Sequence, residues 1–428
     1  MRFALRVAAM AAAMTAGQMS LGVAADMAVK APPASAAPAN PWTITFNSQW
    51  QYVSWTGSRG WPNNLTFSGR GAEFYNPFGM EVAGSSIPNW NFDFVLRGGY
   101  VWASQTVGPF TGSISTPTDS TFSGTATYTG INGIQPYATL MANIPTGLAQ
   151  LSNLSTFARM DPDLVPVPTY GEGFNIGPTL GVTVPVNPEL SMVFNAGYTD
   201  RGHYDKEGGF DPLTMTTVGF QPTQPSDVWT VAGSATWTHQ QLTLNGSVSE
   251  AWETINYVGG MPQYRSGART TVSGSATYMW DDRTTTSLDG YWVHSEKNDI
   301  LSPITGLPPL VAEAFDSNNN IFRINLTHTY KTPFYNGTLI FGPVASFMDR
   351  DRNSWNAGTA QFVPAKTRES VGGTATYIVN DKLNFTGRAE YMWINESQTP
   401  AIIGFPGTFV PTVSGQGVSV SIAATATY

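Results

Sequence analysis

Charged side chains recur at set places in segments that otherwise alternate apolar and polar residues. Side chains alternate along a strand, so charges spaced two or four residues apart share the face opposite to the aromatic residues. Six side chains have this placement: Asp93, Arg97, Asp289, Arg323, Arg388 and Glu390. Charges of both signs on the wall of a water-filled pore could produce a transverse field that orients solutes. The alternative is that they pair with one another and only hold the wall in shape.

Four histidines are present, and their segments give no reason for them to converge. His294 directly precedes Ser295, and neighbours in a strand point to opposite faces, which argues against a catalytic hydrogen bond between them. The segment 349–353 begins like a calcium loop, but Ser354 and Ala360 stand where Gly and Glu are required. Zinc spacings, phosphate-binding glycine loops and basic nucleic-acid patches are missing. The sequence therefore predicts no enzyme, catalytic residue, metal site, cofactor or nucleic-acid partner.

The elements that would position the six charges are marked by a repeated pentapeptide. Five segments end in a Gly/Ala-Thr/Ser-Ala-Thr-Tyr/Trp pattern, at 124–128, 233–237, 274–278, 373–377 and 424–428. Along the last segment, Val418 and Ile422 share one face, whereas Ser419 and Thr425 share the other. One face suits lipid, the other suits water, and the closing aromatic residue suits a membrane interface. This combination is typical of a transmembrane β-barrel.

The spacing of these segments predicts the number of strands. Eight segments in a similar register end at Tyr75, Tyr128, Val184, Trp237, Tyr278, Tyr330, Tyr377 and Tyr428, at intervals of 41 to 56 residues. Eight returning strands fit between them, near 42–56, 90–104, 133–144, 189–202, 241–255, 284–297, 335–349 and 382–396. The sequence thus predicts an all-β fold, a closed antiparallel transmembrane β-barrel of about 16 strands, with 14 possible. The weakest strand, 61–75, would turn Glu73 and Tyr75 outward and Arg70 inward.

The connections between the expected strands differ at the two ends of the barrel. Short turns rich in Gly, Asn, Asp and Pro occur at 130–133, 187–188, 239–241, 281–283 and 380–382. Long loops span 145–172, 203–225, 256–267, 298–317, 350–366 and 397–412. This asymmetry is typical of barrels in the outer membrane of Gram-negative bacteria, with the short turns in the periplasm. Tyr428 would act as the C-terminal assembly signal, through which the last strand meets the barrel assembly machinery.

The long loop 145–172 is the candidate for a constriction. Apolar residues at a spacing of three are followed by two acids: Leu148, Leu151, Leu154, Phe157, Met160, Asp161 and Asp163. A water-exposed loop rarely needs so many apolar groups, and long loops are usually functional or disordered. One interpretation folds 148–160 as a short helix inside the barrel, with the two acids near the opening, and favours amphipathic or apolar solutes. The other interpretation is an external lid or a contact with neighbouring subunits.

The N-terminus has the composition of a secretory signal followed by a tether. Arg2 and Arg6 precede an apolar stretch, and small residues end at position 25, which predicts a signal peptide over 1–25. The Ala- and Pro-rich segment 26–41 would be an extended periplasmic tether, and the barrel would occupy 42–428. Cys is missing, which excludes disulfides and thiol chemistry.

Short motifs carry two resemblances to known families. The segment 26–33, Asp-Met-Ala-Val-Lys-Ala-Pro-Pro, resembles the mature start of porin-like outer-membrane β-barrel proteins of Rhizobiales-type alphaproteobacteria. The segments 143–147 and 171–178 are similar to outer-membrane transporter barrels associated with aromatic-compound degradation. The first resemblance implies an outer-membrane location, and the second implies uptake of small molecules.

These observations favour a passive outer-membrane channel, either a porin or a porin-like transporter, for small solutes. Sixteen strands enclose more space than side chains usually fill. The net charge of −8 becomes −10 without Arg2 and Arg6, and an acidic pore would mildly favour cations. The expected partners are outer-membrane lipids and lipopolysaccharide, small-molecule solutes and further copies of the chain. The alternative is a structural or surface-exposed envelope barrel with little transport, whose tether could reach the peptidoglycan.

Overall fold

The computed structural model describes residues 42–428 apart from 62–64, 208–209, 212–215, 218, 303–305, 307, 357–358, 360–361 and 398–413. The expected signal segment, the tether and most of the loop 397–412 lie outside the described residues. Within the described residues the chain is mostly β-strand, with one 3-10 helix, η1 (Asn153–Ala158). No helix in this part of the chain is both long and apolar enough to cross a bilayer.

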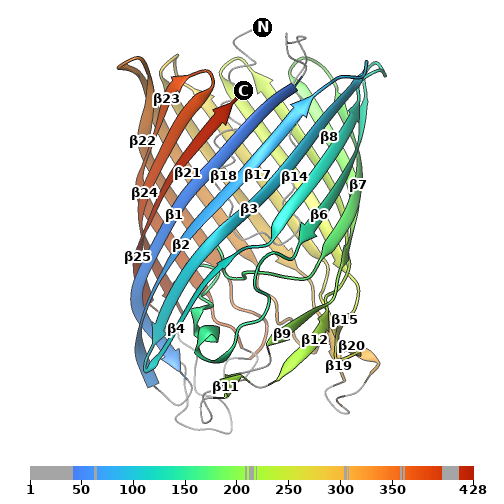
Figure 1. Cartoon of the computed structure of the whole chain (residues 1–428), viewed down its shortest axis with the longest axis vertical. Coiled ribbons are helices and arrows are strands. Elements are labelled where there is room, and N and C mark those ends of the chain that lie inside the picture. Colours follow the sequence, from blue (N-terminus) through green and yellow to red (C-terminus); the bar gives the residue numbers. More distant parts are fainter. Residues whose placement is uncertain are drawn as a thin grey trace.

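The described strands close into one antiparallel barrel (Figure 1), which confirms the predicted fold class. Its wall is sixteen strands around. In order, the strands are β1 (Trp42–Trp61), β2 (Leu65–Gly84), β3 (Trp90–Val107), β5 (Ser120–Tyr128), β6 (Gln135–Ile144), β7 (Asn175–Pro185), β8 (Leu190–Arg201), β13 (Val228–His239), β14 (Leu242–Glu253), β17 (Arg269–Met279), β18 (Thr284–Ser295), β21 (Ile321–Phe334), β22 (Gly337–Arg350), β23 (Lys366–Asn380), β24 (Leu383–Glu396) and β25 (Ser414–Thr427). The last strand, β25, pairs with β1 and closes the wall. Tyr428 extends this pairing through two backbone hydrogen bonds with Ile44, at 2.8 and 3.1 Å.

The outer face of the wall is apolar and aromatic, as the alternation predicts. On β24, Tyr391 and Trp393 are exposed on the outside, whereas Met392 and Ile394 between them are buried on the inside. Large apolar side chains are exposed in the same way on strands all around the barrel, among them Phe46, Phe94, Leu180, Val248, Leu326 and Val420. Such a continuous apolar surface is suited to lipid rather than to water.

Three of the short turns are built by an Asn or Asp side chain that accepts hydrogen bonds from the following backbone. Asn187 accepts from the N–H of Leu190 at 2.9 Å, and Asn380 accepts from the N–H of Lys382 at 2.8 Å. Asp281 accepts in the same way at its own turn. These side chains favour tight turns because they replace a backbone acceptor. We call this end of the barrel the turn end and the opposite end the loop end.

Strand β2 corrects the expectation for 61–75. It runs from Leu65 to Gly84, so Tyr75 lies in its middle. Arg70 is paired with Thr56 and is exposed on the outer face, whereas Glu73 is buried on the inner face. The predicted orientation was wrong because this segment is rich in glycine, and a weak alternation does not specify which face turns inward.

At one place in the wall, two short strands, β4 (Phe110–Pro117) and β5, lie end to end beside the single strand β3. β3 pairs with β5 along its first half and with β4 along its second half. The division falls at Thr118 and Asp119, directly after Pro117, whose nitrogen cannot donate a ladder hydrogen bond. The wall therefore opens locally at Asp119, next to the end of β6.

The long connections form a second, smaller sheet at the loop end (Figure 1). Three successive connections contribute two strands each: β9 (Tyr204–Glu207) and β12 (Phe220–Gln224), β15 (Asn256–Val258) and β16 (Met261–Arg265), β19 (Asp299–Leu301) and β20 (Leu310–Ala312). Their order is β20-β19-β16-β15-β12-β9. We call this sheet the mouth sheet. A separate hairpin joins β10 (Phe210–Asp211) and β11 (Thr216–Thr217).

The main apolar core lies inside the barrel, between the wall and the connection 145–174, which we call the inner loop. Buried side chains of β1, β3, β4 and β24 pack against buried side chains of the inner loop, namely Leu151, Ala158, Met160, Leu164, Val165, Val167 and Tyr170. The inner loop therefore lies within the barrel and does not cover its rim from outside.

Candidate functional site

The inner loop is fixed at its base by Asp119. One carboxylate oxygen accepts the N–H of Gly147 at 2.9 Å, and the other accepts the N–H of Glu172 at 2.7 Å. The side-chain amide of Asn143 donates to the same carboxylate at 2.9 Å. A carboxylate that accepts several N–H groups makes strong, charge-assisted bonds. One side chain at the division between β4 and β5 thus holds both ends of the inner loop together.

The first half of the inner loop packs closely on β1, β3 and β4. Leu151 is 1% exposed, and Phe157 stacks on Phe110 of β4 with ring centroids 4.9 Å apart. The indole nitrogen of Trp55 lies 3.2 Å from the sulfur of Met160. These contacts bury the apolar side chains against the wall, so the hydrophobic effect holds η1 in place.

Gly112 of β4 allows η1 to approach the wall. A Cβ atom at this position would lie 2.3 Å from the carbonyl oxygen of Leu154 and 2.7 Å from the nitrogen of Ala158. Both atoms belong to the backbone and cannot move aside as a flexible side chain can. Only glycine fits where the two backbones meet.

Side chains of the wall satisfy backbone groups that the inner loop buries. Glu73 of β2 accepts the N–H of Val167 at 3.0 Å. The amide of Gln105 on β3 donates to the carbonyl oxygen of Phe157 at 3.0 Å. Buried backbone groups need such partners, because irregular chain cannot supply them from a regular ladder. The inner face of β2 and β3 is therefore shaped to receive this particular loop.

Beyond η1, the inner loop reaches β22 and β23 through a cluster of buried charges. Lys366, with 2% of its side chain exposed, lies 2.5 Å from Asp161 and 3.0 Å from Asp163. Arg350 lies 3.2 Å from the Asp163 carboxylate, and Arg368 donates to the Asp163 carbonyl oxygen at 2.6 Å. Buried charges persist only when they are paired, so these contacts fix the loop to the wall.

Two effects of opposite sign act on the pKa of Asp161. Burial would raise it, but the Lys366 ammonium with its hydrogen bond, the N–H of Asp163 and the charge of Arg350 together outweigh burial, and the pKa lies below its ordinary value of 3.8. Asp161 is therefore ionised at neutral pH and paired with Lys366. Lys366 begins β23 and Arg350 ends β22, so Asp161 lies at the loop end of the wall, where it is bound to the wall rather than free in the opening.

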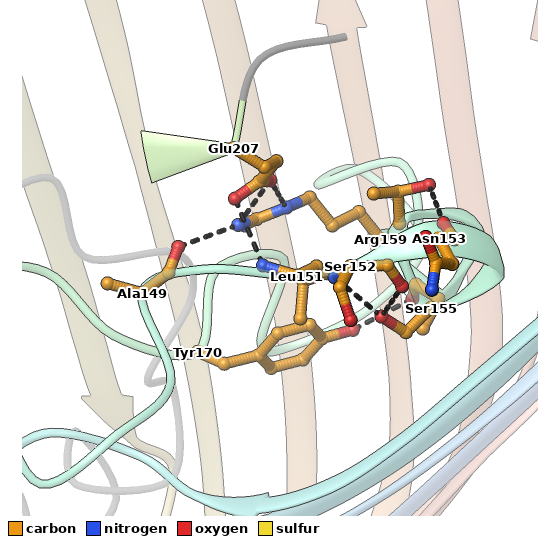
Figure 2. A network of polar contacts seen from close by, with 10 residues as sticks. Ala149, Leu151, Ser152, Asn153, Ser155, Arg159, Tyr170 and Glu207 are labelled. Carbon is orange, nitrogen blue, oxygen red and sulfur yellow. Dashed lines mark hydrogen bonds and ion pairs between the residues drawn. The ribbon is translucent and has the colours of Figure 1, made fainter. Parts of the chain in front are cut away.

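The other side of the inner loop is attached to the mouth sheet (Figure 2). Arg159 donates from Nε to Glu207 of β9 at 2.8 Å, and the N–H of Leu151 donates to the same carboxylate at 3.1 Å. Arg159 also donates to the carbonyl oxygen of Ala149 at 3.3 Å, and the Tyr170 hydroxyl donates to that of Ala158 at 2.8 Å. Glu207 thus links the inner loop to the mouth sheet at the loop end of the barrel.

The structure separates the apolar residues proposed for the constriction into two groups. Leu151 and Phe157 pack toward the wall, whereas Leu148 and Leu154 are 43% and 37% exposed. The regular spacing of three does not produce one apolar stripe, because only residues 153–158 are helical. Most of the apolar surface of the loop therefore serves attachment and is not offered to a solute.

The predicted lumen charges occupy two parts of the inner face, one between β18 and β24 and the other on β3. Arg388 and Glu390 form an ion pair of 2.7 Å on β24. Asp289 of β18 accepts the amide of Asn325 at 2.8 Å, and Arg323 of β21 donates to the oxygen of the same amide at 3.3 Å. Asp93 and Arg97 lie apart from them on β3, on the same face as the buried residues Val101 and Ala103.

The wall from β13 to β18 turns hydroxyl and amide groups toward the interior. Asn245 accepts from Thr236 at 2.8 Å and donates to Ser275 at 2.9 Å, which links three neighbouring strands. Similar pairs join Ser247 with Ser273 at 2.6 Å and Thr277 with Ser287 at 3.1 Å. The apolar core under the inner loop does not include this part of the wall. A solute passing the inner loop would therefore meet a hydrogen-bonding surface whose charged members include Asp289 of β18.

Sequence reasoning missed the residues that hold the inner loop. Lys366 and Arg368 could have been found, because the alternation along β23 places them on the face opposite to Val371 and Ala375. Asp119, Glu73 and Glu207 gave no comparable signal. Their partners are backbone groups or side chains far away in the sequence.

The histidines lie on separate parts of the barrel with separate partners. His294 is hydrogen-bonded to Asn320 at 2.6 Å, and His328 to Thr286 at 2.9 Å. His239 pairs with Glu189 at the turn end. Across the residues that the structure covers, no group of three or more His, Asp or Glu side chains is arranged to hold a metal ion.

No family model matches this chain. No curated protein matches it either. Among solved structures, Pseudomonas aeruginosa OpdQ is similar with 9% identity and a TM-score of 0.43, over 91% of this chain and 99% of that one. A Pseudomonas aeruginosa FadL homologue has 9% identity and a TM-score of 0.40, over 90% of each chain. A BenF-like porin from Pseudomonas fluorescens Pf-5 has 10% identity and a TM-score of 0.39, over 88% of this chain and 97% of that one. All three TM-scores lie below 0.5.

Proposed function

We propose that this protein is a passive channel for small polar solutes in the outer membrane of a Gram-negative bacterium. The observation that carries the proposal is the inner loop, which covers one side of the inner wall of a closed barrel. The side from β13 to β18 keeps its hydroxyl and amide lining. A barrel of this size that is narrowed but polar inside provides a path for water and hydrophilic solutes.

The exterior supports a membrane location. A band of exposed apolar and aromatic side chains surrounds the barrel, and short turns at one end contrast with long connections at the other. A barrel in water needs a polar outer surface. The apolar outer surface of this barrel is instead suited to the hydrocarbon layer of a membrane.

The interior supports polar rather than apolar solutes. Leu151 and Met160 are used to attach the inner loop, and the lumen charges Arg388 and Glu390 remain as a pair on the wall. Opposite charges at a narrowed point create a local field that orients dipolar solutes and hydrated ions. Asp93, Arg97, Asp289 and Arg323 would contribute to the same field.

Several finer features belong to the same proposal. Residues 1–25 would be removed as a signal peptide, and residues 26–41 would form the periplasmic tether. The resemblance of 26–33 to Rhizobiales-type barrels fits this setting. Tyr428 would present the final strand to the barrel assembly machinery, and lipopolysaccharide would surround the outer face. Association of several copies is compatible with the apolar exterior. The transport role makes no use of catalysis.

The test is conductance across a planar lipid bilayer. The mature protein should give steady ohmic current, and a variant lacking residues 148–160 should give a larger current because the inner loop no longer narrows the lumen. Tyr335→Ala serves as the control, since Tyr335 lies in a turn at the turn end and is 87% exposed. Equal currents for the intact protein and the deletion variant would show that the inner loop does not narrow the lumen. Silence of both folded proteins would favour a surface barrel without transport.

A further inference from the structure

A cavity of about 470 Å³ lies between the mouth sheet and the loop end of the barrel. Its lining includes Arg201 and Glu253 from the ends of β8 and β14, and Tyr204, Glu207, Asn256 and Tyr264 from the mouth sheet. Small-molecule sites in proteins are commonly about 300–1,000 Å³. The cavity is therefore large enough for a small solute, and it stands at the entrance that the proposed channel would use.

The charges of this cavity are largely engaged within the protein. Glu207 is paired with Arg159 at 2.8 Å and links the mouth sheet to the inner loop (Figure 2). Arg201 is paired with Glu172 at 3.2 Å. Glu253 accepts a hydrogen bond from Ser266 at 2.9 Å. A lining with two cations, Arg201 and Lys206, and two anions, Glu207 and Glu253, has no net formal charge. It does not select strongly for either sign.

The uncharged groups of the lining are those that bind hydroxyl-rich molecules. Tyr204 and Tyr264 offer aromatic faces and phenol groups, and Asn256 and Gln221 offer amides. Burial is the largest cause that raises the pKa of both tyrosines, so each phenol keeps its proton at neutral pH and can donate it to a ligand.

Ser226 is a buried polar residue of the lining. It lines the cavity and is 2% exposed, and its hydroxyl has no hydrogen-bond partner in the described residues. A buried hydroxyl without a partner costs free energy, and native proteins rarely leave one unless a further group completes it. The oxygen is closed off from the cavity, so a solute would reach it only after the lining moves.

We propose that this cavity is a binding site for a neutral polyhydroxylated solute with the chemistry of a small sugar. The inference deepens the proposed channel function, because it names the solute class that the mouth would collect. The bound solute would next meet the inward hydroxyl and amide groups of Asn245, Ser247 and Thr277, which can exchange hydrogen bonds with it without a change of charge. Tyr264 and Asn256 would make the contacts that distinguish a sugar from an ion.

Binding and transport are measured separately in the test. The purified mature protein is titrated calorimetrically with glucose and with sucrose, and with acetate, arginine and glycine as anionic, cationic and zwitterionic probes. The same protein is examined in a planar bilayer for current blockades by each probe. We expect the sugars to bind and block, and Tyr264→Ala and Gln221→Leu to weaken sugar affinity at least tenfold. Gln221 is exposed, so its substitution leaves the fold intact. Tyr335→Ala is the matched control.

The outcomes separate the two proposals. Normal ion conductance without sugar binding would overturn the sugar site and leave the channel in place. Sugar binding without conductance would overturn the channel and leave the site. Binding of a charged or zwitterionic probe in preference to both sugars would overturn the assigned solute class. If neither Tyr264→Ala nor Gln221→Leu changed sugar binding, the sugar would bind outside this cavity.

Discussion

Lys366 shows at the scale of one residue how the lumen is narrowed. Its ammonium lies among carboxylates of the inner loop, more than two hundred residues earlier in the chain, and 2% of its side chain is exposed. Desolvating a lysine is costly, and only paired carboxylates offset that cost. Removing the lysine would leave Asp161 and Asp163 buried beside the remaining partners Arg350 and Arg368.

Replacing this lysine should release the inner loop from β23. We expect Lys366→Met to destabilise the attached loop by about 3–5 kcal/mol, because it leaves buried carboxylates short of a counter-charge. The measurement is single-channel conductance, which should increase. Lys382→Met, at an exposed turn, is the matched control and should conduct as the unmodified protein does. A conductance of Lys366→Met equal to that of the control would mean that the cluster does not hold the loop.

The same cluster predicts a dependence on pH. Because the pKa of Asp161 in the folded protein lies below its ordinary value of 3.8, the ionised form contributes stability above that value. The contribution is lost as the pH falls through the lowered pKa. Loop-dependent conductance should therefore stay constant between about pH 5 and pH 7 and rise only below the ordinary range of an Asp carboxyl. The rise should be missing in Lys366→Met, and a rise already complete at pH 5 would contradict the assignment.

At the scale of elements, the inner loop and the strand β4 form one unit. Asp119 holds the two ends of the loop, and Gly112 brings β4 into backbone contact with η1. β4 exists as a separate strand because Pro117 interrupts the ladder at Thr118 and Asp119. The gap in the ladder gives the Asp119 carboxylate access to the loop.

A methyl group at Gly112 should separate η1 from the wall. We expect Gly112→Ala to cost about 1–3 kcal/mol, because the new Cβ would lie 2.3 Å from a backbone oxygen. Limited proteolysis should then cleave residues 148–160 faster. Gly246→Ala is the matched control, since a Cβ at this strand glycine meets nothing within 4 Å. Equal cleavage rates in the two variants would show that the close approach does not position the helix.

At the scale of the whole molecule, the barrel divides its side chains between lipid and lumen. Leu180 on β7 is 65% exposed on the outer face, whereas Ser275 on β17 faces the interior and bonds to Asn245. Both residues lie in the middle of a strand, but their side chains face different surroundings.

An arginine placed on each side should distinguish these surroundings. Leu180→Arg should lower the free energy of unfolding from lipid vesicles by about 2–4 kcal/mol, the cost of a cation near the bilayer midplane. Ser275→Arg should cost less and should shift ion selectivity toward anions, because its charge enters the lumen. Urea titration in vesicles measures the first effect and reversal potentials measure the second. Equal destabilisation by both variants would argue against the assigned inner and outer faces.

Alternation made most of the barrel predictable. The segments ending at Tyr128, Trp237, Tyr278 and Tyr377 lie in strands β5, β13, β17 and β23, and the turns at Asn187, Asp281 and Asn380 form where turn chemistry predicts them. The inward and outward faces of β2 were predicted wrongly because its glycines weaken the alternation of apolar and polar residues. The mouth sheet was not predicted, since its strands are three to five residues long and pair between different connections.

Outside β2, the sequence by itself determined which side chains point inward and where the chain turns, because both depend on near neighbours along a strand or a turn. Only the tertiary structure decided where the inner loop lies and what holds it there. Lys366, Glu73, Asp119 and Glu207 meet the loop across large separations in sequence. Such contacts arise only after the wall has closed, since closure brings β22–β24 beside β1–β4 and creates the buried surface that the inner loop covers.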